Sequence, residues 1–234
     1  MTKVSVLIVD DHPVFRQGLR DVFRSESDFN IVGEGADGNE ALKLITSLNP
    51  EVVLMDINLP GMNGLQVTRQ IKATHHRASV IMLTAYDDAE QAMHAFKAGA
   101  LAYCPKDVMP QKLIEVIHQV VSGHYVVGDQ LFDRDGIEVW MEKGVSEKAR
   151  TYGDDAQDLF SPLSPREMQI LQYVTRGLRN KEIAFSLGIS HQTVKNHMTA
   201  ILHKLNVEDR TQAAVYALRH GWVRLQDSKS EKGN

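Results

Sequence analysis

In the first half of this chain, acidic, hydroxyl and basic side chains stand at or just after the ends of short β-branched segments. These side chains are Asp10 and Asp11, Asp56, Thr84 and Lys106, associated with the segments 4–9, 52–55, 80–84 and 102–104. Carboxylates that lie close together repel one another unless a cation neutralises them. Their oxygens suit Mg²⁺, and an adjacent hydroxyl and ammonium suit a phosphoryl group. These residue types therefore predict a magnesium-dependent phosphoryl site.

The elements that must position these side chains alternate between short apolar segments and longer amphipathic ones. Strands are predicted over 4–9, 31–34, 52–55, 80–84 and 102–104, and helices over 13–25, 38–48, 64–74, 88–98 and 110–122. This alternation is typical of a parallel sheet with helices on both faces. Ligands of such sheets bind at the carboxyl ends of the strands, beside the point where the winding direction reverses. We therefore expect a five-stranded α/β domain with its site at that edge.

Composition excludes several other classes of protein. Among 234 residues there is one cysteine, Cys104, so neither an intrachain disulfide nor a multi-thiolate metal site can form. The longest apolar segments fall far short of the ~20 residues of a membrane span. The first residues lead into a strand-like segment and lack the pattern of a signal peptide. We expect a cytoplasmic protein that does not associate with membranes.

The net charge of −4 argues at first against nucleic-acid binding, but the charge is unevenly distributed. Residues 1–160 carry a net charge of −9, whereas residues 161–234 carry 11 basic and 6 acidic side chains, a net charge of +5. The basic part is therefore a candidate for contact with DNA. The opposite signs also lead to the hypothesis that the acidic half docks on the basic half in the resting state, which salt would weaken.

A change of pattern near the middle of the chain predicts two domains. Between 123 and 159 the periodicity fades and Gly and Asp accumulate, which indicates a linker with at most a short helix over 136–144. Ser164 then precedes Pro165, with Glu167 at the third helical position, a strong helix start. The predicted organisation is a domain over 1–122, a linker over 123–159, a small all-α domain over 160–226 and a disordered tail over 227–234.

The second domain contains the outline of a helix-turn-helix, with a stop at Gly188 and a new N-cap at Ser190. One stripe of the following helix is apolar, and the opposite stripe is polar and cationic. That polar stripe consists of Gln192, Lys195, Asn196, Thr199 and His203, with Thr193, His197 and Lys204 near enough to reach phosphates. In a major groove, Lys195 would suit guanine and Asn196 would suit adenine.

Four motifs in order make residues 3–122 resemble the receiver domain of a two-component response regulator. They are the segment 6–13 around Asp10 and Asp11, the segment 52–64 with Asp56, Pro60, Gly61 and Gly64, the segment 81–85 around Thr84, and Gly99, Tyr103 and Lys106. The resemblance implies a flavodoxin-like fold. In place of the proline that many receivers carry after the lysine, this chain has Asp107.

The resemblance also implies a role for each acidic residue. Asp56 would be the phosphoacceptor, attacking the phosphohistidine of a sensor histidine kinase to form an acyl phosphate. Asp11 and Asp56 would ligate Mg²⁺ together with the backbone carbonyl of Asn58, and Asp10 would act mostly through water. The chain would then catalyse only its own phosphorylation and dephosphorylation, and would not be an enzyme with a separate substrate.

The same resemblance implies a conformational switch. Lys106 would neutralise the phosphoryl oxygens, and the hydroxyl of Thr84 would move toward them. The aromatic ring of Tyr103 would then turn into the space that Thr84 vacates. Phosphorylation would in this way shift the domain between two states, which needs a differential stability of only a few kcal/mol.

Residues 160–225 resemble a LuxR-type DNA-binding domain. The motifs that carry this resemblance are 163–167, Gly177 with 180–184, Ser190 with 193–197, and Ile201 with Lys204 and Leu205. Thr199 departs from relatives that often carry a basic residue there. Together the two domains resemble a NarL/FixJ-family response regulator, which implies binding to double-stranded promoter DNA as a homodimer paired through a last helix beginning after Asp209.

Two alternatives remain open. An aspartyl-phosphate phosphatase or a flavin protein could share the α/β fold. However, the phosphatases place Asp-x-Asp after the first strand, and this chain has adjacent aspartates and no evident loop for a flavin phosphate. Alternatively, the receiver could be vestigial, with DNA binding controlled by dimer concentration or another ligand. The complete acidic site favours the phosphorylation-switched regulator.

Overall fold

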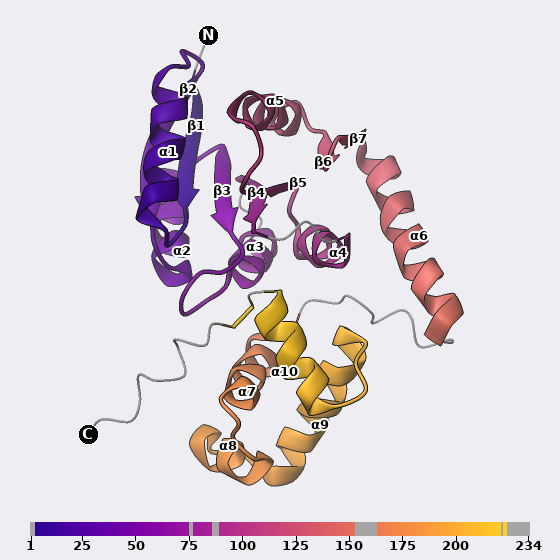
Figure 1. Ribbon diagram of the computed structural model, residues 1–234. Coiled ribbons are helices and arrows are strands. Elements are labelled where there is room, and N and C mark those ends of the chain that lie inside the picture. The colour runs from indigo at the N-terminus through magenta and orange to yellow at the C-terminus, as the bar shows by residue number, and fades with distance from the viewer. Residues whose placement is uncertain (1–2, 75–76, 86–88, 153–162, 221, 224–234) are drawn as a thin grey trace, which may run out of the picture. The chain divides into compact units, whose positions relative to one another are not determined.

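The computed structural model describes residues 3–74, 77–85, 89–152, 163–220 and 222–223 (Figure 1). The chain divides into two compact units, Met1–Glu142 and Lys143–Asn234, and each is described by itself. The predicted tail over 227–234 lies outside the described residues, as does part of the predicted linker. None of the described helices is long and apolar enough to cross a membrane.

The first unit is built on one twisted sheet. Its strands are β1 Val4–Val9, β2 Phe29–Gly35, β3 Val52–Asp56, β4 Ser79–Thr84, β5 Ala102–Pro105, β6 Tyr125–Val127 and β7 Gln130–Phe132. They lie in the order β2-β1-β3-β4-β5-β6-β7, and every pair is parallel except β6 with β7. The chain reverses its winding direction between β1 and β3. A ligand of this fold is therefore expected beyond the carboxyl ends of those two strands.

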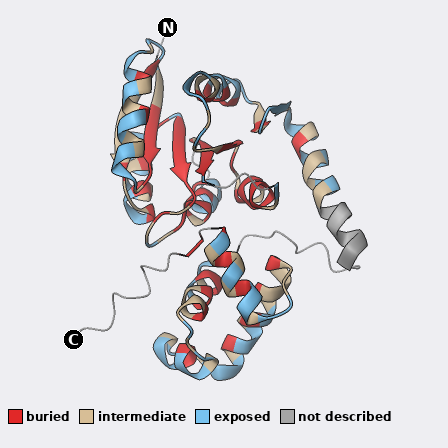
Figure 2. Cartoon of the chain, viewed as in Figure 1, coloured by how far each residue is buried: buried red, intermediate tan, exposed pale blue. Residues whose placement is uncertain are grey.

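Helices cover both faces of the sheet, and its central strands are buried between them (Figures 1 and 2). The helices are α1 Pro13–Arg24, α2 Gly38–Leu48, α3 Gly64–Ala73, α4 Ala89–Ala98 and α5 Pro110–Val121. On one face, side chains of α1 and α5 pack on alternate residues of the strands, such as Val6, Ile8 and Leu54. Strands buried on both faces consist almost wholly of apolar residues, which explains the continuous apolar segments in the sequence.

The structure differs from the prediction of a five-stranded sheet followed by a linker over 123–159. The segment after α5 adds two short strands, β6 and β7, and then α6 Arg134–Tyr152 in place of the short helix expected over 136–144. Strands of three residues are too short to show a hydrophobic period, and they form because β5 offers an edge to pair with. Val126 of β6 and Ile137 of α6 are buried, so this extension contributes to the core of the first unit.

The loop after β3 depends on a glycine. A Cβ atom added to Gly64, the first residue of α3, would lie 2.2 Å from the carbonyl oxygen of Asp56. The amide of Gly64 also donates to the carbonyl of Ile57 at 2.9 Å. Only glycine allows this close approach of two backbone segments, so Gly64 sets how the chain leaves Asp56.

The second unit is helical. Its helices are α7 Pro165–Thr175, α8 Asn180–Leu187, α9 His191–Leu205 and α10 Arg210–Arg219. The predicted caps are confirmed: Ser164 and Glu167 form a capping box, Gly188 adopts a left-handed conformation (φ 62°), and Ser190 accepts a hydrogen bond from the Thr193 amide. α8 and α9 thus form the predicted helix-turn-helix.

Candidate functional site

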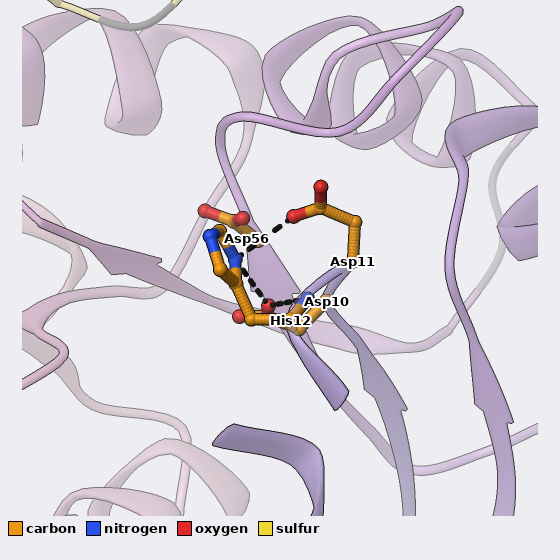
Figure 3. Close-up of side chains that lie close together, drawn as sticks. All are labelled: Asp10, Asp11, His12 and Asp56. Carbon is orange, nitrogen blue, oxygen red and sulfur yellow. Dashed lines mark hydrogen bonds and ion pairs between the residues drawn. The ribbon is translucent and has the colours of Figure 1, made fainter. Parts of the chain in front are cut away.

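The three aspartates predicted from the strand ends meet at one edge of the sheet. Val9 of β1 is in register with Met55 of β3, so the next residues, Asp10 and Asp56, stand side by side. Both side chains are only 1% exposed. Figure 3 shows their carboxylates gathered with the carboxylate of Asp11 and the imidazole of His12.

Lys106 connects the two buried carboxylates. Its Nζ lies 2.7 Å from Asp10 Oδ2 and 2.9 Å from Asp56 Oδ2. The backbone amide of Lys106 donates to the carbonyl of Thr84, and the Phe15 ring lies 5.1 Å from Nζ. These contacts position the ammonium although Asp107 stands where many receivers have a proline.

The electrostatic balance of the site is incomplete, because one ammonium faces two buried carboxylates. Burial raises the pKa of Asp56 above its ordinary value, and the negative charge of Asp10 raises the pKa further. The charge of Lys106, its hydrogen bond and the hydrogen bond from the Asn58 amide act in the opposite direction without cancelling the effect. An additional cation would relieve this excess negative charge.

The donor set fits a divalent cation. One ligand atom from each of Asp10, Asp11, His12 and Asp56 lies within 4.8 Å of the others. The carboxylate oxygens suit a hard cation such as Mg²⁺. The backbone amide of Asn58 donates to Asp56 Oδ1 at 3.1 Å, so residue 58 lies beside the same carboxylate. Asp11 and Asp56 would therefore supply carboxylate ligands, and Asp10 lies close enough to act on the cation through water.

Sequence reasoning assigned no role to His12. Its Nδ1 lies 3.1 Å from Asp10 Oδ1 and 2.9 Å from Asp11 Oδ1, although the side chain is 62% exposed. Its backbone amide also donates to Asp10 Oδ1 at 2.8 Å. His12 thus orients the two adjacent carboxylates. Its position directly after them in the sequence was the available signal.

A buried glutamine that sequence reasoning also missed connects the two predicted switch residues. Gln91 on α4 accepts hydrogen bonds at Oε1 from Thr84 Oγ1 at 3.1 Å and from Tyr103 Oη at 2.8 Å. All three residues are buried, so the ring of Tyr103 points inward. The structure therefore brings Thr84 and Tyr103 together through a third residue.

In the second unit, the predicted polar stripe of α9 is accessible. Gln192, Lys195, Asn196 and Thr199 are exposed, and Thr193, His197 and His203 are partly exposed. Val194, Met198, Ile201 and Leu205 are buried, as the apolar stripe predicts. Gln192 Nε2 donates to Asn196 Oδ1 at 3.0 Å, which orders two of the candidate base-reading side chains.

Comparison with protein families decides the class of both units. The model of the response regulator receiver domain matches residues 6–118, and the model of the bacterial regulatory proteins of the luxR family matches residues 161–217. The transcriptional regulatory protein DegU of Brevibacillus brevis is 33% identical over 96% of this chain and 97% of its own length. This chain belongs to the LuxR-type response regulators.

Other response regulators show the same similarity over their whole length. VraR of Staphylococcus aureus is 34% identical to this chain, over 94% of it and 99% of VraR. The relatives are DNA-binding response regulators of two-component systems, and this chain is one as well. Its flavodoxin-like receiver fold and its helical DNA-binding domain are confirmed.

Solved structures agree with the fold. The receiver domain of NarL from Mycobacterium tuberculosis is 32% identical with a TM-score of 0.51, and covers 53% of this response regulator and 99% of that chain. A LuxR-family response regulator from an Aurantimonas species is 30% identical with a TM-score of 0.52, and covers 62% of this chain and 99% of that chain. RcsB of Salmonella typhimurium is 22% identical with a TM-score of 0.59, and covers 94% of this chain and 98% of its own. At that identity the similarity shows the fold alone.

One predicted DNA contact of this response regulator has a structural partner. Lys204 Nζ lies 3.0 Å from Glu167 Oε1 and 2.8 Å from Oε2, and thereby joins α9 to the start of α7. The spacing that placed Lys204 near a phosphate gave no sign of Glu167, which is 37 residues away. The Lys204 ammonium is therefore used within the domain, and a phosphate contact for it remains a prediction.

Substituting Asp56 by Asn should stabilise the receiver when no divalent cation is present. The raised pKa of Asp56 means that its ionised form opposes folding as the pH rises through that pKa, so removing the charge should help at neutral pH. We expect a gain of about 1 kcal/mol or more in the free energy of unfolding, measured by urea denaturation with EDTA. The gain should shrink as the pH falls toward the ordinary carboxyl value of 3.8.

Asp107→Asn is the matched control, because this exposed carboxylate is adjacent to the same lysine. It should change the free energy of unfolding by no more than about 0.5 kcal/mol. An Asp56→Asn variant less stable than the wild type in EDTA would contradict the electrostatic account of the site.

Lys204→Ala should lower the stability of the DNA-binding domain by about 1–3 kcal/mol, since it leaves the buried Glu167 carboxylate without its ammonium. Burial opposes ionisation of Glu167, but hydrogen bonds from Lys204 and Ser164 outweigh it and lower the pKa. The contribution of the pair is thus present above the ordinary value of 4.5 and is lost as the pH falls.

Urea denaturation of the full chain, followed by Trp222 fluorescence in a Trp140→Phe background, measures this effect. Lys195→Ala, which removes an exposed lysine from the same helix, is the control and should leave stability nearly unchanged. Equal stabilities of the two variants would show that the Lys204–Glu167 pair contributes nothing.

Proposed function

We propose that Asp56 accepts a phosphoryl group from the phosphohistidine of a sensor histidine kinase in the cytoplasm, and that this controls promoter binding by the second domain. The observation that carries the proposal is the Lys106 ammonium held between two buried carboxylates, at 2.7 and 2.9 Å. This arrangement is suited to receive additional positive charge and a phosphoryl group together.

The chemistry follows from the positions of the side chains. A carboxylate oxygen of Asp56 attacks the phosphorus atom, an O–P bond forms, and the N–P bond to the donor imidazole breaks. Lys106 neutralises charge on the transferred oxygens. Mg²⁺ would be held by Asp11, Asp56 and the Asn58 carbonyl, and by Asp10 mostly through water, and it would supply further positive charge to the transfer. The backbone amide of Asn58 orients the attacking carboxylate.

A groove beside this site offers a surface for the phosphodonor. A cavity of about 600 Å³ lies between α1 and α5, with largely apolar residues along it and with His12 and Lys106 at its lining. Val14 at the start of α1 is 85% exposed, and Met109 just before α5 is 71% exposed. An exposed apolar groove next to a polar site is a candidate interaction surface. We propose that the histidine-bearing domain of the kinase docks here.

The output would be binding of a homodimer to double-stranded DNA. A single domain of this size covers only ~600–1,000 Å² of protein surface on DNA, so two copies on two half-sites are expected. The exposed stripe of α9 would enter the major groove, with Lys195 and Asn196 reading base edges and Thr193 and His197 contacting phosphates. α10, on which Val215 is 55% exposed, would pair the two copies.

Phosphotransfer from acetyl phosphate tests the proposal directly. Full-length protein incubated with acetyl phosphate and Mg²⁺ should gain the mass of one phosphoryl group, and Asp56→Asn should gain none. Asp107→Asn removes an exposed carboxylate that is adjacent in sequence to the same lysine, and this variant should be phosphorylated like the wild type. Label that survives on Asp56→Asn would remove Asp56 from this role, and EDTA should abolish phosphorylation of the wild type.

Alanine substitutions on α9 should separate base reading from general affinity. Lys195→Ala and Asn196→Ala should each weaken binding to a DNA site selected from a random library, by roughly 5- to 150-fold. Binding is measured by fluorescence anisotropy at a fixed salt concentration. Lys43→Ala, which removes an exposed lysine on α2 of the receiver, should leave the affinity unchanged. Wild-type affinity in both α9 variants would exclude this helix face from base contact.

A further inference from the structure

Gln91 holds a position that can connect the phosphorylation site to a helix. It is 1% exposed and lies on α4, whereas its two donors, Thr84 and Tyr103, come from β4 and β5. One oxygen atom, Gln91 Oε1, accepts both hydrogen bonds. Buried hydrogen bonds of this kind are costly to break, so the position of α4 is tied to where the two hydroxyl groups point.

The other end of α4 is in contact with α6 through aromatic rings. Phe96, buried and five residues after Gln91, has its ring centroid 5.7 Å from that of Trp140, with the rings at 73° to each other. The ring centroid of Trp140 also lies 6.4 Å from that of Phe132 on β7. A displacement of α4 would therefore change the surroundings of Trp140, whereas its other aromatic neighbour, Phe132, belongs to β7.

The packing beside α6 leaves room for movement. A cleft of about 460 Å³ lies between the N-terminal part of α6 and the receiver, lined by Phe96 of α4 and by Ile137 and Met141 of α6, among others. Close-packed elements resist displacement, whereas an element beside a cleft can shift without overlapping its neighbours. Among the helices that the structure describes, α6 is the one that precedes α7 of the DNA-binding domain in the chain.

We propose that Gln91 is the positioning residue that ties α4 to the phosphorylation switch, and that the Phe96–Trp140 contact transmits the change to α6. The inference rests on the proposed phosphorylation of Asp56. When the Thr84 hydroxyl turns toward the phosphoryl oxygens, Gln91 Oε1 loses that donor and keeps Tyr103. α4 is then held toward β5, and Phe96 moves relative to Trp140.

Fluorescence of Trp140 tests the inference in the full chain. The protein has two tryptophans, so Trp222→Phe leaves Trp140 as the single reporter. BeF₃⁻ with Mg²⁺ serves as the phosphoryl analogue, and fluorine-19 NMR measures its binding independently. We expect bound BeF₃⁻ to shift the emission maximum or intensity of Trp140, and Asp56→Asn to show neither binding nor a shift.

The two possible failures are distinguishable. Absence of bound BeF₃⁻, together with absence of acetyl phosphate labelling, would contradict the proposed function. Bound BeF₃⁻ without any change in Trp140 emission would overturn the coupling through α4 and leave the proposed function intact.

Variants at Gln91 separate positioning from simple packing. Gln91→Met keeps the length of the side chain but has no oxygen acceptor, so it should bind BeF₃⁻ and lose the Trp140 response. Gln91→Glu restores acceptor oxygens and should recover the response. Circular dichroism checks that each variant is folded. A wild-type response in Gln91→Met, or a folded Gln91→Glu that binds BeF₃⁻ without responding, would overturn the role of Gln91.

The two aromatic neighbours of Trp140 provide a matched pair for the second step. Phe96→Leu removes the ring on α4, and Phe132→Leu removes the ring on β7. The Trp140 response to BeF₃⁻ should be lost in Phe96→Leu and retained in Phe132→Leu. A Trp140 response that is retained in Phe96→Leu as well as in Phe132→Leu would show that the signal does not travel through the α4 contact.

Discussion

The structure of the receiver depends on one ammonium group placed between two buried carboxylates. Lys106 can reach Asp10 and Asp56 only because β1 and β3 are neighbours in register and β5 ends level with them. A single lysine cannot neutralise both anions, and burial together with the charge of Asp10 raises the pKa of Asp56. The unmodified site is therefore electrostatically strained in a way that a cation and a phosphoryl group can relieve together.

In the proposed mechanism, this imbalance is what allows the site to switch. Burial keeps the charges strongly coupled, so a change in charge at Asp56 alters the best positions for nearby hydroxyl groups. The proposed response begins at the Thr84 hydroxyl, and Gln91 on α4 connects Thr84 to Tyr103. In this proposal, small changes in the positions of α4 and α6 alter the affinity of the second domain for DNA. A few kcal/mol between the two states are sufficient to change their populations.

The sequence was most informative where chemistry and strand periodicity coincide. Asp10, Asp56, Thr84 and Lys106 could be located because strand ends in a parallel sheet meet at one edge. Gln91 could not, because one polar residue in a helical segment gives no sign of two partners on neighbouring strands. The Lys204–Glu167 pair and the β6–β7–α6 extension were missed for a similar reason: each depends on contacts distant in sequence or on strands too short to show a period.

The charge state of Asp56 is proposed to control DNA binding by the second domain. The most direct measurement is the affinity of the full-length protein for a selected DNA site, with Mg²⁺ present throughout and BeF₃⁻ added or omitted. The account predicts tighter binding with BeF₃⁻ in the wild type and no effect of BeF₃⁻ on Asp56→Asn. Equal affinities of the wild type under both conditions, with BeF₃⁻ shown to be bound, would contradict it.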